Sequence, residues 1–364
     1  MRTLRRYLFV QIAAASALVL LVFLGLVFFL DVINGLSGGG AHSLAQVMVR
    51  VALEVPGRAY ESMPIAVLTG TVYVLASLAA SSEFTVMRMS GLSPRRALLD
   101  LVALGLGVAA LLFVIGEFVA PAAERLVATL QARDQGGSFG TELRSGVWLR
   151  DRADANDDQM INVGRVAASG TLGDVRIYVI DAQARLAREI VAASADARHG
   201  GYWTLHGVTD TSFPAAPGLP LQVRRTETLN WTTTVSPAML EALLLDPSHM
   251  SLTDLWRYVQ HLRANGQAAQ RDEIAMWRKT LYPFSAVVMM LLALPFAYLH
   301  ARSGQISWKV FGGIMLGISF ILTTVLSSRL GLVASWPTWL AAALPYLLYG
   351  GAGLGFFVWR VRYH

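Results

Sequence analysis

The chain has 364 residues, of which 54% are hydrophobic and only 15% charged, and its mean hydropathy is +0.49. These values exclude an ordinary soluble domain and indicate an integral membrane protein. The net charge of +6 is typical of cytoplasmic loops beside anionic lipid, so nucleic-acid binding is not expected. The chain has no cysteine, which excludes disulfides, thiolate metal sites and cysteine nucleophiles.

Six apolar segments approach or exceed the ~20 residues that a helix needs to cross the hydrocarbon layer. The first follows three arginines in the manner of a signal sequence. It is too long for a signal-peptide core and no small-residue cleavage site closes it, so we expect an uncleaved span. The predicted spans are residues 8–30, 64–80, 97–120, 284–299, 310–328 and 337–359.

Arginine and lysine are concentrated on one side of these spans. With the N-terminus inside, the short outer loops carry only Arg50, Arg58 and Arg329. By the positive-inside rule both termini are then cytoplasmic. The basic residues of the inner segments are Arg2, Arg5, Arg6, Arg88, Arg95, Arg96, Arg302, Lys309, Arg360 and Arg362.

A short charged segment, SSEFTVMRMSGLSPRRALLD at residues 81–100, lies between the second and third predicted spans. Ser81 or Ser82 can cap a helix here, and Glu83 would lie in its first turn, where the helix dipole favours negative charge. Ser93 before Pro94 predicts the start of the next helix. An apolar strip at helical spacing consists of Phe84, Met87 and Gly91.

Two roles fit this segment. A short surface helix with an apolar strip and charges beside it can dock into a groove on a soluble partner. It can equally lie on lipid headgroups, with Arg88, Arg95 and Arg96 meeting phosphates. The residues alone do not separate the two roles.

Residues 121–276 are polar, external in this orientation, and change from a helical to a strand-like pattern. The stretch VRIYVID at residues 175–181 alternates apolar and polar side chains, as in a half-buried strand. We predict an antiparallel β-domain, a jelly roll or open sandwich, between helical connectors. The side chains expected inside it are Trp148, Ile161, Val163, Ile177, Val179, Trp203, Leu205 and Trp231.

The predicted fold class is therefore a membrane α-helical protein with an inserted β-domain. Six transmembrane helices, three on each side, flank a domain that resembles a β-jelly roll. The first three helices and the charged segment occupy residues 1–120, the β-domain with its connectors residues 121–276, and the last three helices residues 277–364.

Several kinds of chemistry have no sequence pattern here. The chain has no phosphate loop and only two lysines, Lys279 and Lys309, so it is not an ATPase by itself. It has no H-E-x-x-H or G-x-S-x-G motif, and its seven histidines lack metal-ligand spacing. We expect no metal, no cofactor and no catalytic residue. Glu117, near the outer end of the third span, has a structural role at least as readily as a functional one.

Three stretches resemble segments of one transporter family. SSEFTVMRMSGLSPRRALL is similar to the S-E-x-x-V-M-x-x-S-G segment of the LptF/LptG permeases, the membrane subunits of the lipopolysaccharide export ABC transporter. GEFVAPAAERL resembles their G-E-x-V-A-P segment at the end of the third span. WRYVQHLRANGQAAQRDEIAMWRKTLYPFSAVVMMLLALPF resembles the segment that enters the fourth. The likeness covers essentially the whole chain and is greater to the LptG branch than to LptF.

The resemblance implies a permease subunit that extracts lipopolysaccharide from the bacterial inner membrane and passes it to a periplasmic bridge. A separate LptB-like ATPase dimer would drive it. The other implied partners are an LptF-like permease, LptC-like and LptA-like periplasmic β-jelly-roll proteins, and membrane lipid. The β-domain would then be periplasmic.

In the family, the segment that matches residues 81–91 is the coupling helix, seated in a groove of the ATPase. The resemblance implies that Glu83 contacts a basic or amide group of the ATPase, while Phe84 and Met87 fill the groove. Arg88 and Gly91 lie on the same element.

Lipopolysaccharide carries phosphates on its headgroup, and arginine binds phosphate bidentately, so cations are expected at the outer rim of a transport cavity. Relatives often carry lysines at the outer end of the first span, where this chain has Asp31 and no cation. The alternative is that the nearby arginines anchor at headgroups or lie in solvent. The candidate lipopolysaccharide ligands are Arg50, Arg58, Arg125 and Arg133.

Two other functions remain open on the sequence. A membrane-anchored scaffold would hold an assembly through its β-domain, and export would then survive changes in the spans. A membrane-embedded lipid-modifying enzyme would need a polar triad near the membrane surface, which the sequence does not show.

Overall fold

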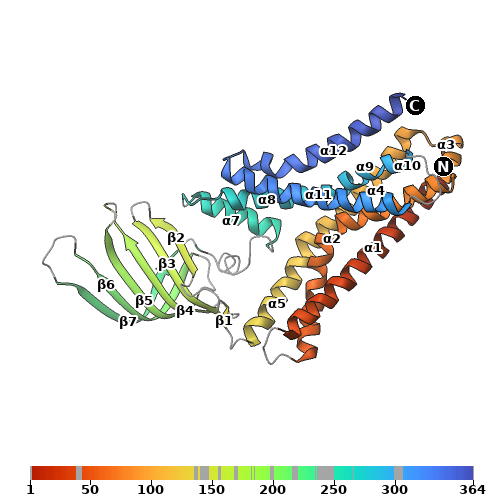
Figure 1. Cartoon of the computed structure of the whole chain (residues 1–364). Helices are drawn as coiled ribbons and strands as arrows, with labels where there is room; N and C mark the ends of the chain where they lie inside the picture. Colours follow the sequence, from red (N-terminus) through yellow and green to blue (C-terminus); the bar gives the residue numbers. More distant parts are fainter. Residues whose placement is uncertain are drawn as a thin grey trace. The chain divides into compact units, whose positions relative to one another are not determined.

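The helices and strands of the chain form two compact units (Figure 1). The first comprises Met1–Glu124 and Glu273–His364, and the second comprises Arg125–Asp272. The structure is a computed structural model. It describes residues 2–37, 43–134, 138–139, 147–154, 157–167, 171–181, 183, 185–196, 201–214, 220–233, 235, 250–264, 266–298 and 306–363.

Among the described residues, six helical stretches are long and apolar enough to cross a membrane, which confirms the six expected. The third continues from α4 through a π-helical turn, Ile115–Val119, into α5. The fourth joins α8, a 3-10 turn at Tyr282–Phe284, α9 and α10. The helices are α1 (Arg2–Ser37), α2 (Leu44–Ala80), α3 (Glu83–Met89), α4 (Pro94–Val114), α5 (Ala120–Asp134), α8 (Gln270–Leu281), α9 (Ser285–Ala293), α10 (Pro295–Tyr298), α11 (Ile306–Val333) and α12 (Thr338–Tyr363).

The second span is longer than the sequence predicts, because α2 runs for 37 residues through Pro56 and Pro64. A spanning helix tolerates proline where neighbouring groups satisfy the freed backbone. Pro64 has no N–H to offer the carbonyl of Tyr60, four residues before it. The hydroxyl of Tyr282 donates to that carbonyl at 3.1 Å and to the carbonyl of Glu61 at 2.9 Å.

α2 and α9 form the buried centre of the helical unit. In the 18-residue apolar stretch of each span, 72% of the residues are buried in the second span and 61% in the fourth. The corresponding shares are 6% in the first span, α1, and 22% in the fifth, α11. α9 is apolar on every side, as a helix enclosed by neighbours must be. The open apolar faces of α1, α4 and α11 suit contact with lipid or with other membrane helices.

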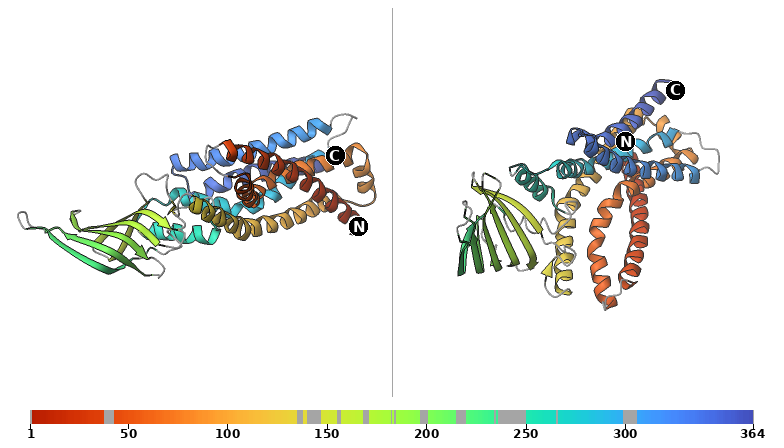
Figure 2. Two further views of the ribbon diagram at one scale, coloured as in Figure 1. Left: turned by 90° about the horizontal axis from the view of Figure 1, so that it is seen from below. Right: turned by 60° about the vertical axis from the view of Figure 1, so that its left-hand side comes forward.

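α1 and α2 lie side by side as an antiparallel pair (Figure 2). They approach closely where Gly70 of α2 faces Ser16 of α1. A Cβ atom at position 70 would lie 2.5 Å from the backbone nitrogen of Ser16 and 2.6 Å from its Cα atom. Membrane helices come this close where a small residue lets the backbones meet. A side chain at Gly70 would therefore separate the pair.

We expect Gly70→Ala to destabilise the helical unit by about 1–3 kcal/mol, the usual cost of an added methyl group in a packed interior. Thermal unfolding of the detergent-purified protein would measure it. Gly25→Ala on α1 is the matched control, because nothing lies within 4 Å of the added methyl group. Equal melting temperatures for the two variants would contradict the close contact.

The second unit contains a seven-stranded antiparallel sheet (Figure 1). β3 to β7 form a meander in which each strand pairs with the next, and β1 and β2 both pair with β3. The antiparallel β-domain predicted from the sequence is confirmed. The elements are β1 (Ser138–Phe139), β2 (Val147–Asp154), β3 (Asp157–Ala167), β4 (Thr171–Ile180), β5 (Leu186–Asp196), β6 (Tyr202–Ser212), β7 (Gln222–Thr232) and helix α7 (Leu252–Ala264).

The alternation of buried and exposed side chains changes phase in two strands of the sheet. In β4 the buried positions step from Leu172 to Val175, because Asp174 between them has a positive φ of 53°. In β6 they step from Leu205 to Val208 across Gly207, whose φ is +63°. A left-handed residue in a strand shifts which later residues face the core. Strict alternation in the sequence does not predict this shift.

The predicted core of the β-domain is correct except at Trp148, which is 50% exposed and stacks on Tyr178 with ring centroids 5.9 Å apart. Its neighbour Leu149, opposite Ile161 in β3, takes the inward position. Where two apolar residues are adjacent, alternation alone does not say which of them faces inward. Trp231 packs against the core while partly exposed. The positions that are fully inside as predicted are Ile161, Val163, Ile177, Val179, Trp203 and Leu205.

Candidate functional site

The short helix α3 continues the chain directly after α2. Ser82 is its N-cap residue and adopts the left-handed conformation, with φ 62° and ψ 4°, but its side chain makes no capping hydrogen bond. The side-chain cap predicted here is therefore wrong. Glu83 lies in the first turn as expected, and its Oε2 accepts a hydrogen bond from the Tyr7 hydroxyl at 3.1 Å. A residue of α1 thus holds the acidic side chain.

The predicted apolar strip of α3 faces the core of its own chain. Phe84 and Met87 are only 4% and 6% exposed. The ring of Phe84 meets the ring of Tyr298 in α10 edge to face, with centroids 5.3 Å apart and an interplanar angle of 87°. This corrects the expectation that both side chains point outward into a partner's groove, because here they anchor α3 to the helical unit.

Gly91 is not part of that strip, because it ends α3. Its φ is 103°, a conformation that favours glycine. The N–H of Leu92 bonds to the carbonyl of Met87, and the N–H of Gly91 to that of Arg88, which is the Schellman pattern. Ser93 then caps α4 through the N–H of Arg96, as the sequence predicts.

The outward apolar residues of α3 are Val86 and Met89, which are 66% and 86% exposed. Sequence reasoning missed them, although they share the i, i+3 spacing of Phe84 and Met87. Glu83 is exposed beside them. Arg88 is exposed too, and its guanidinium lies over the ring of Tyr298, 5.5 Å from the centroid. The free face of α3 is thus apolar with one acid and one base at its edge.

Three of the four candidate headgroup arginines are already paired with carboxylates. The ion pairs are Arg50 with Glu54 at 3.2 Å, Arg58 with Asp31 at 3.3 Å and Arg125 with Asp254 at 2.8 Å. Arg50 and Arg58 share α2, whereas Arg125 and Arg133 share α5. The side chain of Arg133 lies outside the described part of the structure.

These ion pairs are weak restraints. The arginine side chains are 44% to 55% exposed, and exposed ion pairs contribute about 0–1 kcal/mol. A phosphate that accepts two hydrogen bonds from one guanidinium competes well with such a partner. The ion pair with Asp31 therefore leaves the Arg58 guanidinium accessible to a competing anion.

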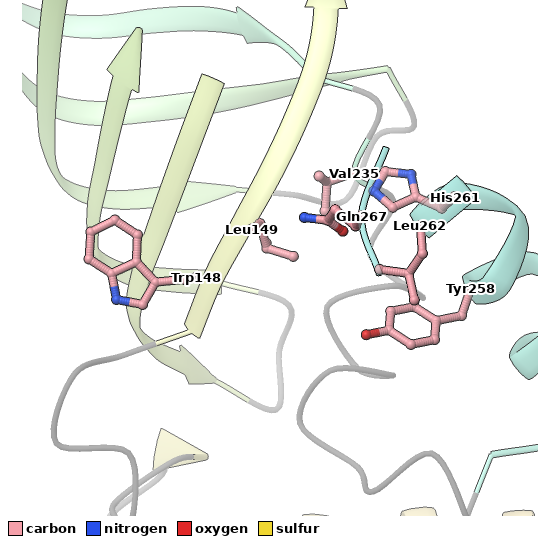
Figure 3. Close-up of a pocket in the computed structure, with 7 residues that line it drawn as sticks. All are labelled: Trp148, Leu149, Val235, Tyr258, His261, Leu262 and Gln267. Carbon is pink, nitrogen blue, oxygen red and sulfur yellow. The ribbon is translucent and has the colours of Figure 1, made fainter. Parts of the chain in front are cut away.

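A small cavity of about 60 Å³ lies within the second unit, where side chains of α7 face the sheet (Figure 3). This volume exceeds the ~10–15 Å³ that one buried water molecule needs, so the cavity has room for water. Burial lowers the pKa of His261 below 6.5, and the charge of Asp151 opposes this effect. The lining residues are Trp148, Leu149, Val235, Tyr258, His261, Leu262 and Gln267.

The lowered pKa of His261 makes the β-domain sensitive to acid. As the pH falls below about 6.5, His261 is protonated in the unfolded chain before it is protonated in the folded one. The folded state is therefore progressively destabilised until the pH has fallen through the lower pKa that His261 has in the folded protein. We expect the protection factors of the α7 amides in the full-length protein, which compare observed with intrinsic exchange rates at each pH, to fall between about pH 7.5 and pH 5. His261→Gln should flatten that dependence.

The matched control is His206→Gln, which changes an exposed histidine of β6 in the same unit. It should leave the wild-type pH dependence of α7 intact. Identical pH profiles for wild type and His261→Gln would contradict the role of this histidine.

Among the described residues, no group of three or more His, Asp or Glu side chains is placed to hold a metal ion. The described residues form a multi-pass helical membrane protein with an inserted antiparallel β-domain and a short surface helix after its second span. The family model described as "Lipopolysaccharide export system permease LptF/LptG" matches residues 6–360. The chain therefore belongs to this family.

Curated relatives agree with the family match. The chain is 30% identical to lipopolysaccharide export system permease protein LptG of Escherichia coli (strain K12) over 325 residues, which is 88% of this chain and 87% of the relative. It is 28% identical to the LptG protein of Haemophilus influenzae (strain ATCC 51907 / DSM 11121 / KW20 / Rd) over 352 residues, 95% and 96% of the two chains. The likeness thus includes the helical unit and the β-domain.

Proposed function

We propose that this protein is a permease subunit of an ABC transporter that extracts lipopolysaccharide from the inner membrane and passes it to a periplasmic bridge for export to the outer membrane. The observation that carries the proposal is the family match over residues 6–360, which spans both compact units. The two relatives are named as permeases of the lipopolysaccharide export system. The protein is a multi-pass inner-membrane protein and a transporter subunit rather than an enzyme.

Both termini and α3 lie on the cytoplasmic side in the proposed orientation, with the β-domain in the periplasm. The distribution of arginine and lysine among the short loops supports it, since the inner segments carry most of them. In this orientation residues 1–120 and 277–364 form the membrane-embedded part of the protein. Residues 121–276 form the periplasmic domain with its connectors.

A separate LptB-like ATPase supplies the energy in this proposal, and α3 is its docking helix. Val86 and Met89 offer exposed apolar area, and Glu83 and Arg88 add charge at the edge. A helix that fills a groove through i, i+3 side chains is a common way of binding a soluble partner. Phe84 does not touch the ATPase in this proposal. It supports the docking of α3 by fixing the helix to its own chain through Tyr298.

The remaining proposed partners are those that the family resemblance implies. An LptF-like permease would cover open apolar surface of the helical unit. LptC-like and LptA-like β-jelly-roll proteins would continue the path in the periplasm. The open apolar faces of α1 and α11 support the need for a membrane partner, because their windows are only 6% and 22% buried within this chain.

Recovery of partners from the native host tests the proposal. The tagged chain would be purified in gentle detergent, and everything that accompanies it identified by mass spectrometry. We expect a P-loop ATPase, a second six-span relative and lipopolysaccharide. Recovery of the chain alone would overturn the transporter assignment.

We expect Met89→Glu to weaken retention of the ATPase by about tenfold or more, the effect of losing one central apolar contact of an interface. The thermal stability of the chain should not change, because Met89 is 86% exposed. Phe84→Ala should instead lower the stability of the chain itself by about 3–5 kcal/mol.

Met48→Glu is the matched control for this prediction. It makes the same substitution at a partly exposed methionine near the start of α2, the end of that helix far from α3. Retention would be measured as the ATPase-to-permease ratio after affinity purification. Full retention with Met89→Glu would show that this face of α3 does not bind the ATPase.

Arg58 is the best placed of the proposed headgroup ligands, because its partner Asp31 can be neutralised without removing the guanidinium. We expect Asp31→Asn to raise the affinity for lipopolysaccharide by about two- to fivefold, the worth of one exposed ion pair. Arg58→Gln should lower it. Titration of the purified protein with lipopolysaccharide would measure both. No change in either variant would make Arg58 a headgroup anchor rather than a ligand.

A further inference from the structure

α3 is fastened to α1 by a hydrogen bond between residues far apart in the sequence. The hydroxyl of Tyr7, near the start of α1, donates to Oε2 of Glu83 at 3.1 Å. Tyr7 is 43% exposed, so its ring is not needed to fill the core. A hydrogen bond to a carboxylate is stronger than one between two neutral groups. The contact therefore sets where the Glu83 side chain points.

The connection between α2 and α3 is short and contains one unfavourable backbone conformation. Only Ser81 and Ser82 separate the two helices, and Ser82 holds φ at 62° with no side-chain capping bond. Residues other than glycine keep this conformation where surrounding contacts impose it. The hydrogen bond from Tyr7 is such a contact, because it holds the first turn of α3 against α1.

The other side of α3 is held by the second half of the chain. Tyr298 of α10 meets Phe84 edge to face and lies under the guanidinium of Arg88. α3 therefore bridges two parts of the helical unit. One attachment runs through Tyr7 to the first span, and the other through Tyr298 to the fourth.

α1 and α2 are closely packed, and the hydrogen bond from Tyr7 to Glu83 attaches α3 to this pair. Besides the approach of Gly70 to Ser16, a Cβ atom at Gly35 would lie 2.7 Å from Cγ1 of Val47. The two helices are thus in close contact near the loop of the hairpin and again further along its length. If α3 moves and pulls on Tyr7, the closely packed α1 and α2 are expected to move together.

We propose that Tyr7 is a positioning residue for energy coupling, whose hydroxyl orients Glu83 toward the ATPase and transmits displacement of α3 to the α1–α2 pair. The inference rests on the proposed function, because it takes α3 as the contact with the ATPase. Without the hydroxyl, the first turn of α3 keeps its attachment to α10 through Phe84 but loses its attachment to α1, so part of the displacement does not reach the α1–α2 pair. ATP hydrolysis then continues while less lipid moves per ATP.

The test uses the complete transporter, copurified from the native host and reconstituted in liposomes that contain lipopolysaccharide. Lipopolysaccharide extracted and ATP hydrolysed would be measured together for wild type and Tyr7→Phe. We expect normal assembly, continued ATP hydrolysis and a fall in lipid extracted per ATP of about two- to tenfold, the range for loss of one hydrogen bond. An unchanged ratio would overturn the inference.

Two further variants separate positioning from general stability. Tyr73→Phe removes the hydroxyl of an exposed tyrosine on α2 and should leave the ratio unchanged. Glu83→Ala should lower the ratio, and adding Tyr7→Phe to it should have no further effect, because the acceptor is already gone. Additive losses in the double variant would show that Tyr7 does not act through Glu83.

The same experiment distinguishes this inference from the proposed function. A wild-type complex that lacks an ATPase, or moves no lipopolysaccharide, would overturn both. A wild-type complex that extracts lipid, with a Tyr7→Phe variant that matches it in lipid per ATP, would overturn the positioning role alone and leave the permease assignment in place.

Discussion

A backbone carbonyl that loses its helical partner inside a membrane must find another donor within the protein. Pro64 imposes this constraint at the centre of the helical unit, and the Tyr282 hydroxyl meets it by donating to the carbonyls of Tyr60 and Glu61. The rings of Tyr60 and Tyr282 also lie 4.5 Å apart. A side chain at Gly116, in the π-helical turn of the third span, would collide with the Tyr60 ring. The second, third and fourth spans therefore meet at one point.

The rest of the helical unit is arranged around that meeting point. α2 and α9 are enclosed, so they can be apolar throughout without an amphipathic stripe. α1, α4 and α11 stay at the periphery with broad apolar faces open. A closed centre with open flanks suits a subunit that shares the membrane with partner helices and a lipid cargo, as the proposed function requires.

α3 shows how one short segment serves the inside and the outside of the chain. Two apolar pairs at the same spacing run along seven residues. Phe84 and Met87 hold the helix to its own unit, while Val86 and Met89 remain open. Because the inner pair is anchored on Tyr298, the outer pair is presented on a defined face. Exposed ion pairs such as Arg58 with Asp31 have no comparable anchoring, since solvent screens them.

The sequence by itself determined the six apolar helices, the antiparallel β-domain between them and the family. Each depends on patterns local to a segment, namely length, hydropathy, alternation and short motifs. It also placed Glu83 on a helix and Ser93 at the start of the next one, since capping is set within a few residues. Most of the β-domain core followed from alternation in the same way.

Only the tertiary structure decided which faces of those elements are used. The sequence of α3 contains two equivalent apolar pairs, and the position of Tyr298 selects the inner one. Trp148 and Leu149 are adjacent, and pairing of Leu149 with Ile161 puts the leucine inside. The contacts Tyr7 to Glu83, Tyr282 to Tyr60 and Asp31 to Arg58 join residues distant in the chain. Such contacts depend on how the helices pack against one another, and a local sequence pattern does not predict that packing.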